Sequence, residues 1–153
     1  MEKKIPQHIV LFPDGNRRWA KERGLSPFEG HQQGYKNLID FANWCKNRGV
    51  KVLTAFGFST ENWNRSPEEV SYLMNLLETG ILDLAEIFKK DNVRVKVLGQ
   101  RERLPESLQV AINKAESETQ NNTQFYLNLA VSYGGKWDIL NATKNIAREG
   151  ILP

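Results

Sequence analysis

Short runs of β-forming residues alternate with long amphipathic stretches along this chain, and that alternation restricts its fold more than any other feature. The strand-like runs cover residues 8–12, 50–58, 93–98 and 124–131, and the helix-like stretches cover about 16–23, 28–48, 67–89, 105–119 and 136–148. Strands joined by helices run parallel, because a crossover of that length returns the chain to the same end of the sheet. The sequence therefore predicts an α/β fold with a mostly parallel sheet flanked by helices.

The length of 153 residues fits one domain, residues 1–153. A net charge of +3 is too small to indicate a nucleic-acid partner, although it permits anionic substrates or a membrane surface. Cys45 is the single cysteine and no signal peptide is recognisable, so we expect a cytoplasmic protein in which Cys45 is packed rather than reactive. The apolar runs are shorter than the ~20 residues of a membrane helix, so any membrane contact would be peripheral.

The first predicted strand ends in Asp14-Gly15-Asn16-Arg17-Arg18 and continues directly into a helix. Ligands of parallel sheets collect at the carboxyl ends of the strands, where a glycine turn and free helix N–H groups favour an anion. Two adjacent arginines suit phosphate oxygens, and a carboxylate beside them is explained if Mg²⁺ bridges Asp14 and a diphosphate. Alternatively, Asp14 is a helix cap and the arginines form a solvated face.

The second predicted strand ends in a polar segment, Ser59-Thr60-Glu61-Asn62-Trp63-Asn64-Arg65. Loops in this position often carry function, although a connector rich in Ser, Thr and Asn is also an ordinary turn. His31, flanked by Gly30 and Gly34, is expected near the same edge of the sheet. A lone histidine is commonly structural, but the two glycines permit close approach of a backbone or a ligand.

Several other chemistries have no support in the sequence. There is no phosphate-binding loop with a Gly-Lys-Ser/Thr ending, no Gly-x-Gly-x-x-Gly fingerprint, no Cys/His cluster at zinc spacing and no Gly-x-Ser-x-Gly elbow around Ser59. The aspartates are scattered, which argues against an aspartate-rich two-metal site. The residues by themselves therefore indicate an α/β domain with a Mg²⁺–diphosphate pocket.

Taken together, the motifs resemble the cis-prenyltransferase family, whose bacterial members are undecaprenyl diphosphate synthases or isoprenyl transferases. The likeness runs from about His8 to the last residue, in the family's order and spacing. The segments that carry it are residues 14–20, Gly30-His31-x-x-Gly34, residues 58–65 with Glu69-Val70 and Leu73-Met74, and Leu127-Asn128-Leu129-Ala130-x-x-Tyr133-Gly134-Gly135.

The resemblance implies that isopentenyl diphosphate is condensed with an allylic diphosphate, such as farnesyl diphosphate, to give a cis-polyprenyl diphosphate for carrier-lipid synthesis. Asp14 would hold Mg²⁺ and assist departure of the diphosphate, and Asn62 would act with Ser59 on the second substrate and in proton removal. The helix over 67–89 would form a mobile wall of a hydrophobic tunnel. Gly57, which has no side chain, would leave space inside this tunnel. The remaining positions implied to bind substrate are Gly15, Asn16, Arg17, Arg18, Trp19, His31, Thr60, Glu61, Trp63 and Arg65.

The chain departs from the family pattern at several positions. Pro13 and Arg17 stand where methionine and glycine are usual, and Ser132 and Lys136 replace a usual Asn and Arg. Pro27 replaces a diphosphate-binding arginine, for which either Arg17 or Arg23 is a candidate substitute.

The family continues well beyond this chain, through a loop that binds isopentenyl diphosphate, a metal-ligating glutamate and much of the dimer interface. We therefore expect a C-terminally truncated member that binds an allylic diphosphate without elongating it and exposes apolar surface. The homodimer of the family is in question here unless a complementing chain supplies the rest. A non-catalytic prenyl-diphosphate-binding or partner subunit is the alternative, but the joint presence of Asp14, Asn62 and Arg65 favours catalytic ancestry.

Overall fold

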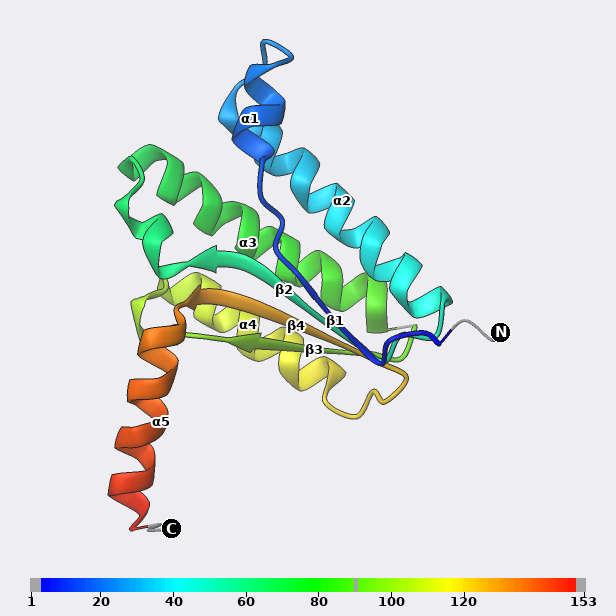
Figure 1. Cartoon of the computed structure of the whole chain (residues 1–153), viewed down its shortest axis with the longest axis vertical. Coiled ribbons are helices and arrows are strands. Elements are labelled where there is room, and N and C mark those ends of the chain that lie inside the picture. The colour runs from blue at the N-terminus through cyan, green and yellow to red at the C-terminus, as the bar shows by residue number, and fades with distance from the viewer. Residues whose placement is uncertain (1–3, 90, 151–153) are drawn as a thin grey trace.

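The computed structural model describes residues 4–89 and 91–150 and contains one four-stranded parallel sheet (Figure 1). Its strands are β1 (His8–Leu11), β2 (Val52–Ser59), β3 (Val93–Leu98) and β4 (Phe125–Tyr133), in the order β1-β2-β4-β3. Each neighbouring pair is parallel. The predicted α/β class is thereby confirmed, and the carboxyl ends of the strands share one edge of the sheet.

The helices occupy the segments that the apolar spacing predicted. They are α1 (Asn16–Lys21), α2 (Pro27–Asn47), α3 (Pro67–Lys89), α4 (Glu106–Thr119) and α5 (Gly135–Glu149), with short 3-10 helices η1 (Thr60–Asn64) and η2 (Arg101–Arg103). The start of α2 is set by a capping box, in which Ser26 Oγ accepts from the Glu29 N–H and Glu29 accepts from the Ser26 N–H. Pro27 takes the first helical position, where its missing N–H costs nothing.

The hydrophobic core lies between one face of the sheet and the helices α2, α3 and α4, with α3 in contact with both of the others. Its largest fully buried side chains include Phe58, Leu53, Leu108, Ile112 and Leu127. Cys45 is also fully buried, and burial raises the pKa of its thiol. On the opposite face, Thr54 and Asn128 are half-buried and Arg94 and Lys96 are exposed, so this face is more open.

Helix α5 projects away from the sheet, as Figure 1 shows. Among its described residues none is buried, and Ile139, Leu140 and Ile146 are 70%, 61% and 48% exposed. Exposed apolar surface was expected from the sequence, and these three side chains of α5 are part of it. No helix in the described part of the chain is both long enough and apolar enough to cross a membrane.

Candidate active site at the carboxyl ends of the strands

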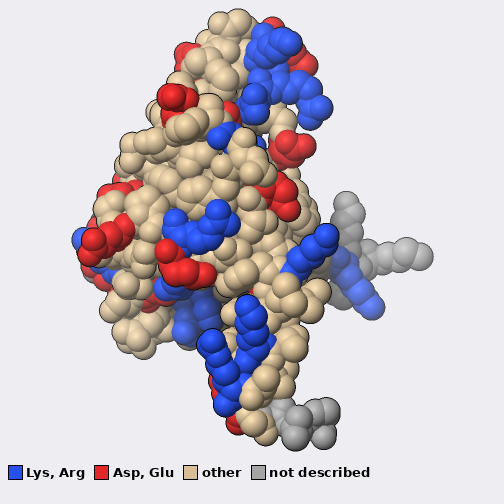
Figure 2. All heavy atoms as spheres, turned by 90° about the vertical axis from the view of Figure 1, so that its left-hand side faces the viewer, with Lys and Arg blue, Asp and Glu red and all other residues tan. Residues whose placement is uncertain are grey.

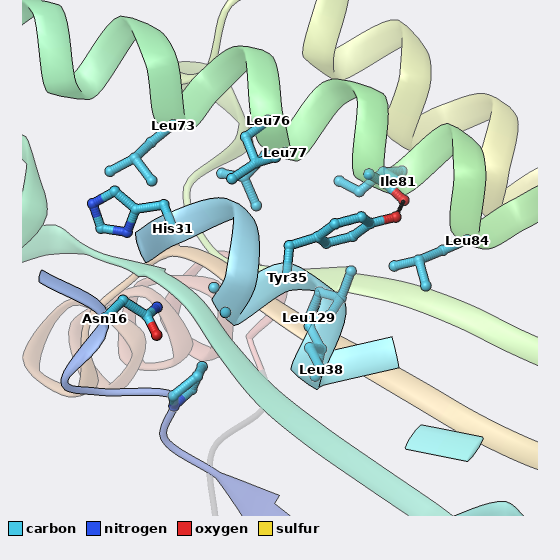
Figure 3. Close-up of a pocket in the computed structure, with 14 residues that line it drawn as sticks. Asn16, His31, Tyr35, Leu38, Leu73, Leu76, Leu77, Ile81, Leu84 and Leu129 are labelled. Atoms are coloured by element: carbon cyan, nitrogen blue, oxygen red, sulfur yellow. Dashed lines mark hydrogen bonds between the residues drawn. The ribbon is translucent and has the colours of Figure 1, made fainter. Parts of the chain in front are cut away.

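Two adjoining cavities lie at the carboxyl-terminal edge of the sheet. The first is a polar pocket of about 410 Å³ lined by Phe12, Pro13, Asp14, Gly15, Asn16, Arg17, Arg18, His31, Phe56, Gly57, Ser59, Asn62, Arg65 and Leu73. The second is a smaller, mainly apolar cavity of about 100 Å³ between α2, α3 and the sheet (Figure 3). Five residues line both cavities, namely Pro13, Asn16, His31, Gly57 and Leu73. The polar pocket therefore opens into the apolar cavity.

The β1–α1 turn supplies one wall of the polar pocket. Gly15 has a positive φ of 94°, a conformation that favours glycine, and it lets the chain turn straight into α1. Asp14 is exposed and its Oδ1 accepts from the Gly15 N–H at 2.7 Å. Gly15 occupies the cap position of α1, which has no side-chain capping hydrogen bond, so the alternative of Asp14 as a helix cap is not what the structure shows.

Lys and Arg side chains gather over α1 at the top of Figure 2. Arg17 and Arg18 from this helix line the polar pocket, and Arg65 lines it from the segment after η1. Arg23 instead lies over the Trp19 ring, 4.5 Å from its centroid, and donates to the Trp19 carbonyl. Arg17 and Arg23 were the two candidates to replace the arginine that is usual in the family at the position of Pro27. Of these two, Arg17 lines the polar pocket.

A buried carboxylate, Glu69 of α3, connects the cationic side chains of the pocket. Glu69 Oε1 accepts from His31 Nε2 at 3.0 Å and from Arg65 Nη1 at 3.0 Å. Arg17 Nη1 lies 3.9 Å from Glu69 Oε2. Burial raises the pKa of this carboxyl, but the His31 hydrogen bond and the charges of Arg65 and Arg17 outweigh it and lower the pKa overall. Glu69 is therefore ionised at neutral pH and holds His31 and Arg65 in place.

The role of Glu69 was not predicted from the sequence, although the residue belongs to the family-like motif. Arg65 lies only four positions before Glu69, but it precedes the start of α3 at Pro67 and has extended backbone, so the helical i,i+4 rule did not predict their contact. The contact with His31 spans 38 positions and has no local signal.

An aromatic wall was also missed. Phe12 is 65% exposed and stacks on Phe56 with their ring centroids 4.6 Å apart, and both rings line the polar pocket. Phe56 in turn meets Tyr133 edge to face. This wall places apolar surface beside the charged groups.

The two glycines around His31 allow α2 to approach α1. A Cβ on Gly34 would lie 2.4 Å from Asn16 Nδ2, and one on Gly30 would lie 2.3 Å from the Asn16 carbonyl oxygen. The close approach that the glycines predicted is thus made by another part of the chain. It positions Asn16, which lines both cavities.

The β2–η1 junction presents Ser59 and Asn62 to the polar pocket. Ser59 N–H donates to Asn62 Oδ1 at 3.0 Å, which is half of a reciprocal capping box at the start of η1. The amide side chain of Asn62 is therefore held by its own turn before any ligand binds.

Four of the residues predicted to bind substrate, Trp19, Thr60, Glu61 and Trp63, are not among the described residues that line either cavity. The Trp63 indole N–H donates to Ser132 Oγ at 3.0 Å, and its ring meets Phe58 edge to face. The Arg103 guanidinium lies 4.9 Å from the ring centroid. Trp63 thus packs η1 against the end of β4.

Trp63→Phe is expected to lower the free energy of unfolding by about 1 kcal/mol, because it leaves the buried Ser132 hydroxyl without its donor. Chemical unfolding measures this change, with Trp44→Phe at a half-exposed site as the control. A change no larger than that of the control would contradict the structural role. Allylic diphosphate binding by the same variant tests the substrate-binding role that the motif implied.

Comparison with known proteins identifies the family. Residues 12–152 match the family model described as "Putative undecaprenyl diphosphate synthase". The chain belongs to this cis-prenyltransferase family. The resemblance inferred from the sequence motifs is confirmed.

Similar cis-prenyltransferases come from plants and bacteria. A chloroplastic (2Z,6Z)-farnesyl diphosphate synthase of Solanum lycopersicum is 48% identical, over 97% of this chain and 52% of that protein. An isoprenyl transferase of Fusobacterium nucleatum is 44% identical, over 98% of this chain and 65% of that protein. The chain thus spans about half to two thirds of the length of these relatives.

The fold is shared with solved cis-prenyltransferase structures. The crystal structure of lavandulyl diphosphate synthase from Lavandula x intermedia, in complex with dimethylallyl diphosphate, matches with a TM-score of 0.91 and 38% sequence identity. The match covers 95% of this chain and 64% of that one. The four-stranded parallel sheet and its helices therefore match about two thirds of that cis-prenyltransferase structure.

Proposed function

We propose that this chain provides the allylic-substrate half of a prenyltransferase that condenses isopentenyl diphosphate with an allylic diphosphate to give a cis-polyprenyl diphosphate. The observation that carries the proposal is the polar pocket that opens into an apolar cavity through five shared residues. A diphosphate head would lie against the arginines, and an isoprenoid tail would enter the space between α2 and α3. Relatives named for such synthases support the same reaction class.

In this reaction the allylic C–O bond breaks and the diphosphate leaves with the electron pair. The double bond of isopentenyl diphosphate attacks the allylic carbon. The resulting cation then passes a proton to the released diphosphate, with Ser59 and Asn62 assisting the removal, and a new double bond forms. Arg17, Arg18 and Arg65 line the pocket where negative charge grows on the leaving group. Cationic donors held in place before the reaction stabilise such charge, and Glu69 holds Arg65 in this way.

Mg²⁺ is the metal that this chemistry calls for, and the donors of the chain fit it. Among the described residues no group of three or more His, Cys, Asp or Glu is arranged to hold a metal ion. Mg²⁺ commonly binds through one or two carboxylates, with substrate phosphates and water completing its shell. Asp14 is exposed at the pocket and would hold the ion, which neutralises diphosphate charge when bound.

Ser59 and Asn62 would orient the second substrate, since both line the polar pocket beside His31. The part of the relatives that this chain does not span would supply the remainder of that second site, from the same protein or from a complementing chain. Homodimerisation, peripheral membrane contact and a role in carrier-lipid synthesis belong to the same proposal. A second candidate is a non-catalytic subunit that binds prenyl diphosphates, since binding without catalysis would use the same polar pocket.

Calorimetric titration with dimethylallyl, geranyl and farnesyl diphosphates, in Mg²⁺ and in EDTA, tests the proposal. We expect Mg²⁺-dependent binding that Asp14→Ala weakens about tenfold, the effect of losing roughly 1.4 kcal/mol at one metal ligand. Asp40→Ala, an exposed carboxylate on α2, is the matched control and should leave binding unchanged. A folded chain that binds none of the three diphosphates would rule the proposal out.

Incorporation of labelled isopentenyl diphosphate tests whether this chain elongates an allylic diphosphate by itself. Turnover that Asp14→Ala abolishes would assign catalysis to this chain and show that its second site is sufficient. Binding without turnover would support an allylic half-site or the non-catalytic subunit.

A further inference from the structure

The apolar cavity is crossed by one side chain, Tyr35 of α2 (Figure 3). Its hydroxyl donates to the Gly80 carbonyl of α3 at 3.3 Å. A Cβ on Gly80 would lie 2.8 Å from Tyr35 Cε2, so the ring lies directly against the helix backbone. Tyr35 therefore bridges the two helices that form the walls of the cavity.

Tyr35 lies inward from the mouth of the cavity. His31, one helical turn earlier on α2, and Leu73 on α3 line both the polar pocket and the apolar cavity. Gly80 lies about two turns beyond Leu73. A tail that entered from the polar pocket would meet the Tyr35 ring before it reached Leu84 at the inner end (Figure 3).

The space in front of this ring is small. The cavity measures about 100 Å³, whereas an apolar cavity of about 150 Å³ holds one benzene molecule. The cavity therefore has room for about one five-carbon isoprenoid unit. Longer tails require the Tyr35 ring to move.

The Tyr35 hydroxyl keeps its proton at neutral pH. Burial, together with the charge of Asp83, raises the pKa of Tyr35 to about 12. The hydrogen bond to Gly80 therefore persists under ordinary conditions, and moving the ring costs both that bond and its packing.

We propose that Tyr35, seated on Gly80, limits the length of the isoprenoid tail, so that this site selects dimethylallyl diphosphate over farnesyl diphosphate. The inference rests on the proposed function, because it concerns the tail of the same allylic substrate. Tyr35 is a specificity-determining residue in this scheme and takes no part in the chemistry.

The test compares wild type, Tyr35→Ala and Tyr35→Phe by calorimetric titration in Mg²⁺ with inorganic diphosphate, dimethylallyl diphosphate and farnesyl diphosphate. In the wild type we expect dimethylallyl diphosphate to bind at least about tenfold more tightly than farnesyl diphosphate. Tyr35→Ala should gain about tenfold or more for farnesyl diphosphate, because the added apolar contact is worth about 0.8 kcal/mol per buried CH₂. Tyr35→Phe keeps the ring but lacks the hydrogen bond to Gly80, so it should keep most of the selectivity.

Inorganic diphosphate separates the two proposals, since it needs the polar pocket and not the cavity. Its affinity should be the same in all three proteins. Wild type that binds farnesyl diphosphate as tightly as dimethylallyl diphosphate, or Tyr35→Ala with an unchanged ratio, would overturn the inference and leave the proposed function standing. Failure of the wild type to bind any of the three ligands would instead count against the proposed function. If Tyr35→Ala does not fold, Tyr35→Leu is the replacement variant, because leucine is too short to contact Gly80 but keeps apolar volume. The ratio of its affinities for dimethylallyl and farnesyl diphosphate then provides the test.

Discussion

Glu69→Ala is expected to weaken binding of dimethylallyl diphosphate about a hundredfold, since Arg65 would no longer be held toward the ligand and a hydrogen bond to a charged group contributes about 1.5–3 kcal/mol. Glu69 is the shared acceptor of His31 and Arg65, and both of these line the polar pocket. Without Glu69, Arg65 loses the hydrogen bond that holds its guanidinium toward the ligand. Calorimetric titration in Mg²⁺ measures the loss.

The same variant should lower the free energy of unfolding by about 1–3 kcal/mol, because the buried His31 ring and the partly buried Arg65 lose the acceptor of their hydrogen bonds. Glu68→Ala, an exposed carboxylate in the same helical turn, is the control and should change both quantities little. Glu69→Gln keeps the shape and an acceptor oxygen, so its losses should be smaller. Wild-type affinity in Glu69→Ala would show that Arg65 and His31 hold their positions without it.

The pH dependence of unfolding provides a second readout for Glu69. The folded chain lowers the pKa of this carboxyl below its ordinary value of 4.5. Its stabilisation is therefore complete above that value and is lost as the pH falls through the lowered pKa. Glu69→Gln should lack this part of the acid sensitivity, and equal acid sensitivity in both proteins would contradict the assignment.

Gly34→Ala is expected to weaken allylic diphosphate binding about a hundredfold while changing stability little. The new Cβ would lie 2.4 Å from Asn16 Nδ2, so the Asn16 side chain must leave the position in which it lines both cavities. Alanine is better than glycine in a helix by about 0.5–1 kcal/mol, which offsets part of the strain. Titration and thermal unfolding measure the two effects separately.

Gly30→Ala provides the contrast. Its Cβ would lie 2.3 Å from the Asn16 carbonyl oxygen, which is backbone and cannot rotate away, so α1 itself must shift. We expect a loss of about 1–3 kcal/mol in the free energy of unfolding in addition to the loss of binding. Gly135→Ala, where nothing lies within 4 Å of the added Cβ, should behave as wild type. Unimpaired binding by Gly34→Ala would mean that Asn16 takes no part in the site.

Much of the secondary structure could be predicted because its signals are local. Ser26, Pro27 and Glu29 form a cap within four positions, and α2 begins at Pro27, close to the predicted start. The predicted strands at 8–12 and 93–98 correspond closely to β1 and β3. The strand order was not predictable, because the pairing of β2 with β4 depends on how the intervening helices pack.

The candidate site divides in the same way. Asp14, Arg17, Arg18, Ser59, Asn62 and Arg65 were predicted because they follow the ends of parallel strands and because the family-like motifs include them, and all of them line the polar pocket. Trp63 belongs to the same family-like motif, yet its indole turns toward Ser132. A motif gives the position of a residue along the chain, whereas the packing of the strand ends sets the direction of its side chain.

The sequence by itself determined the α/β class, the family, and the set of polar residues that the proposed Mg²⁺–diphosphate ligand would meet. It could do so because alternation of apolar residues, capping residues and strand-end motifs act over a few neighbouring positions. Only the tertiary structure decided that Glu69 contacts His31 and that Tyr35 crosses the apolar cavity to Gly80. These contacts join residues 38 and 45 positions apart, and their existence depends on how α2 packs against α3, which spacing along the chain does not specify.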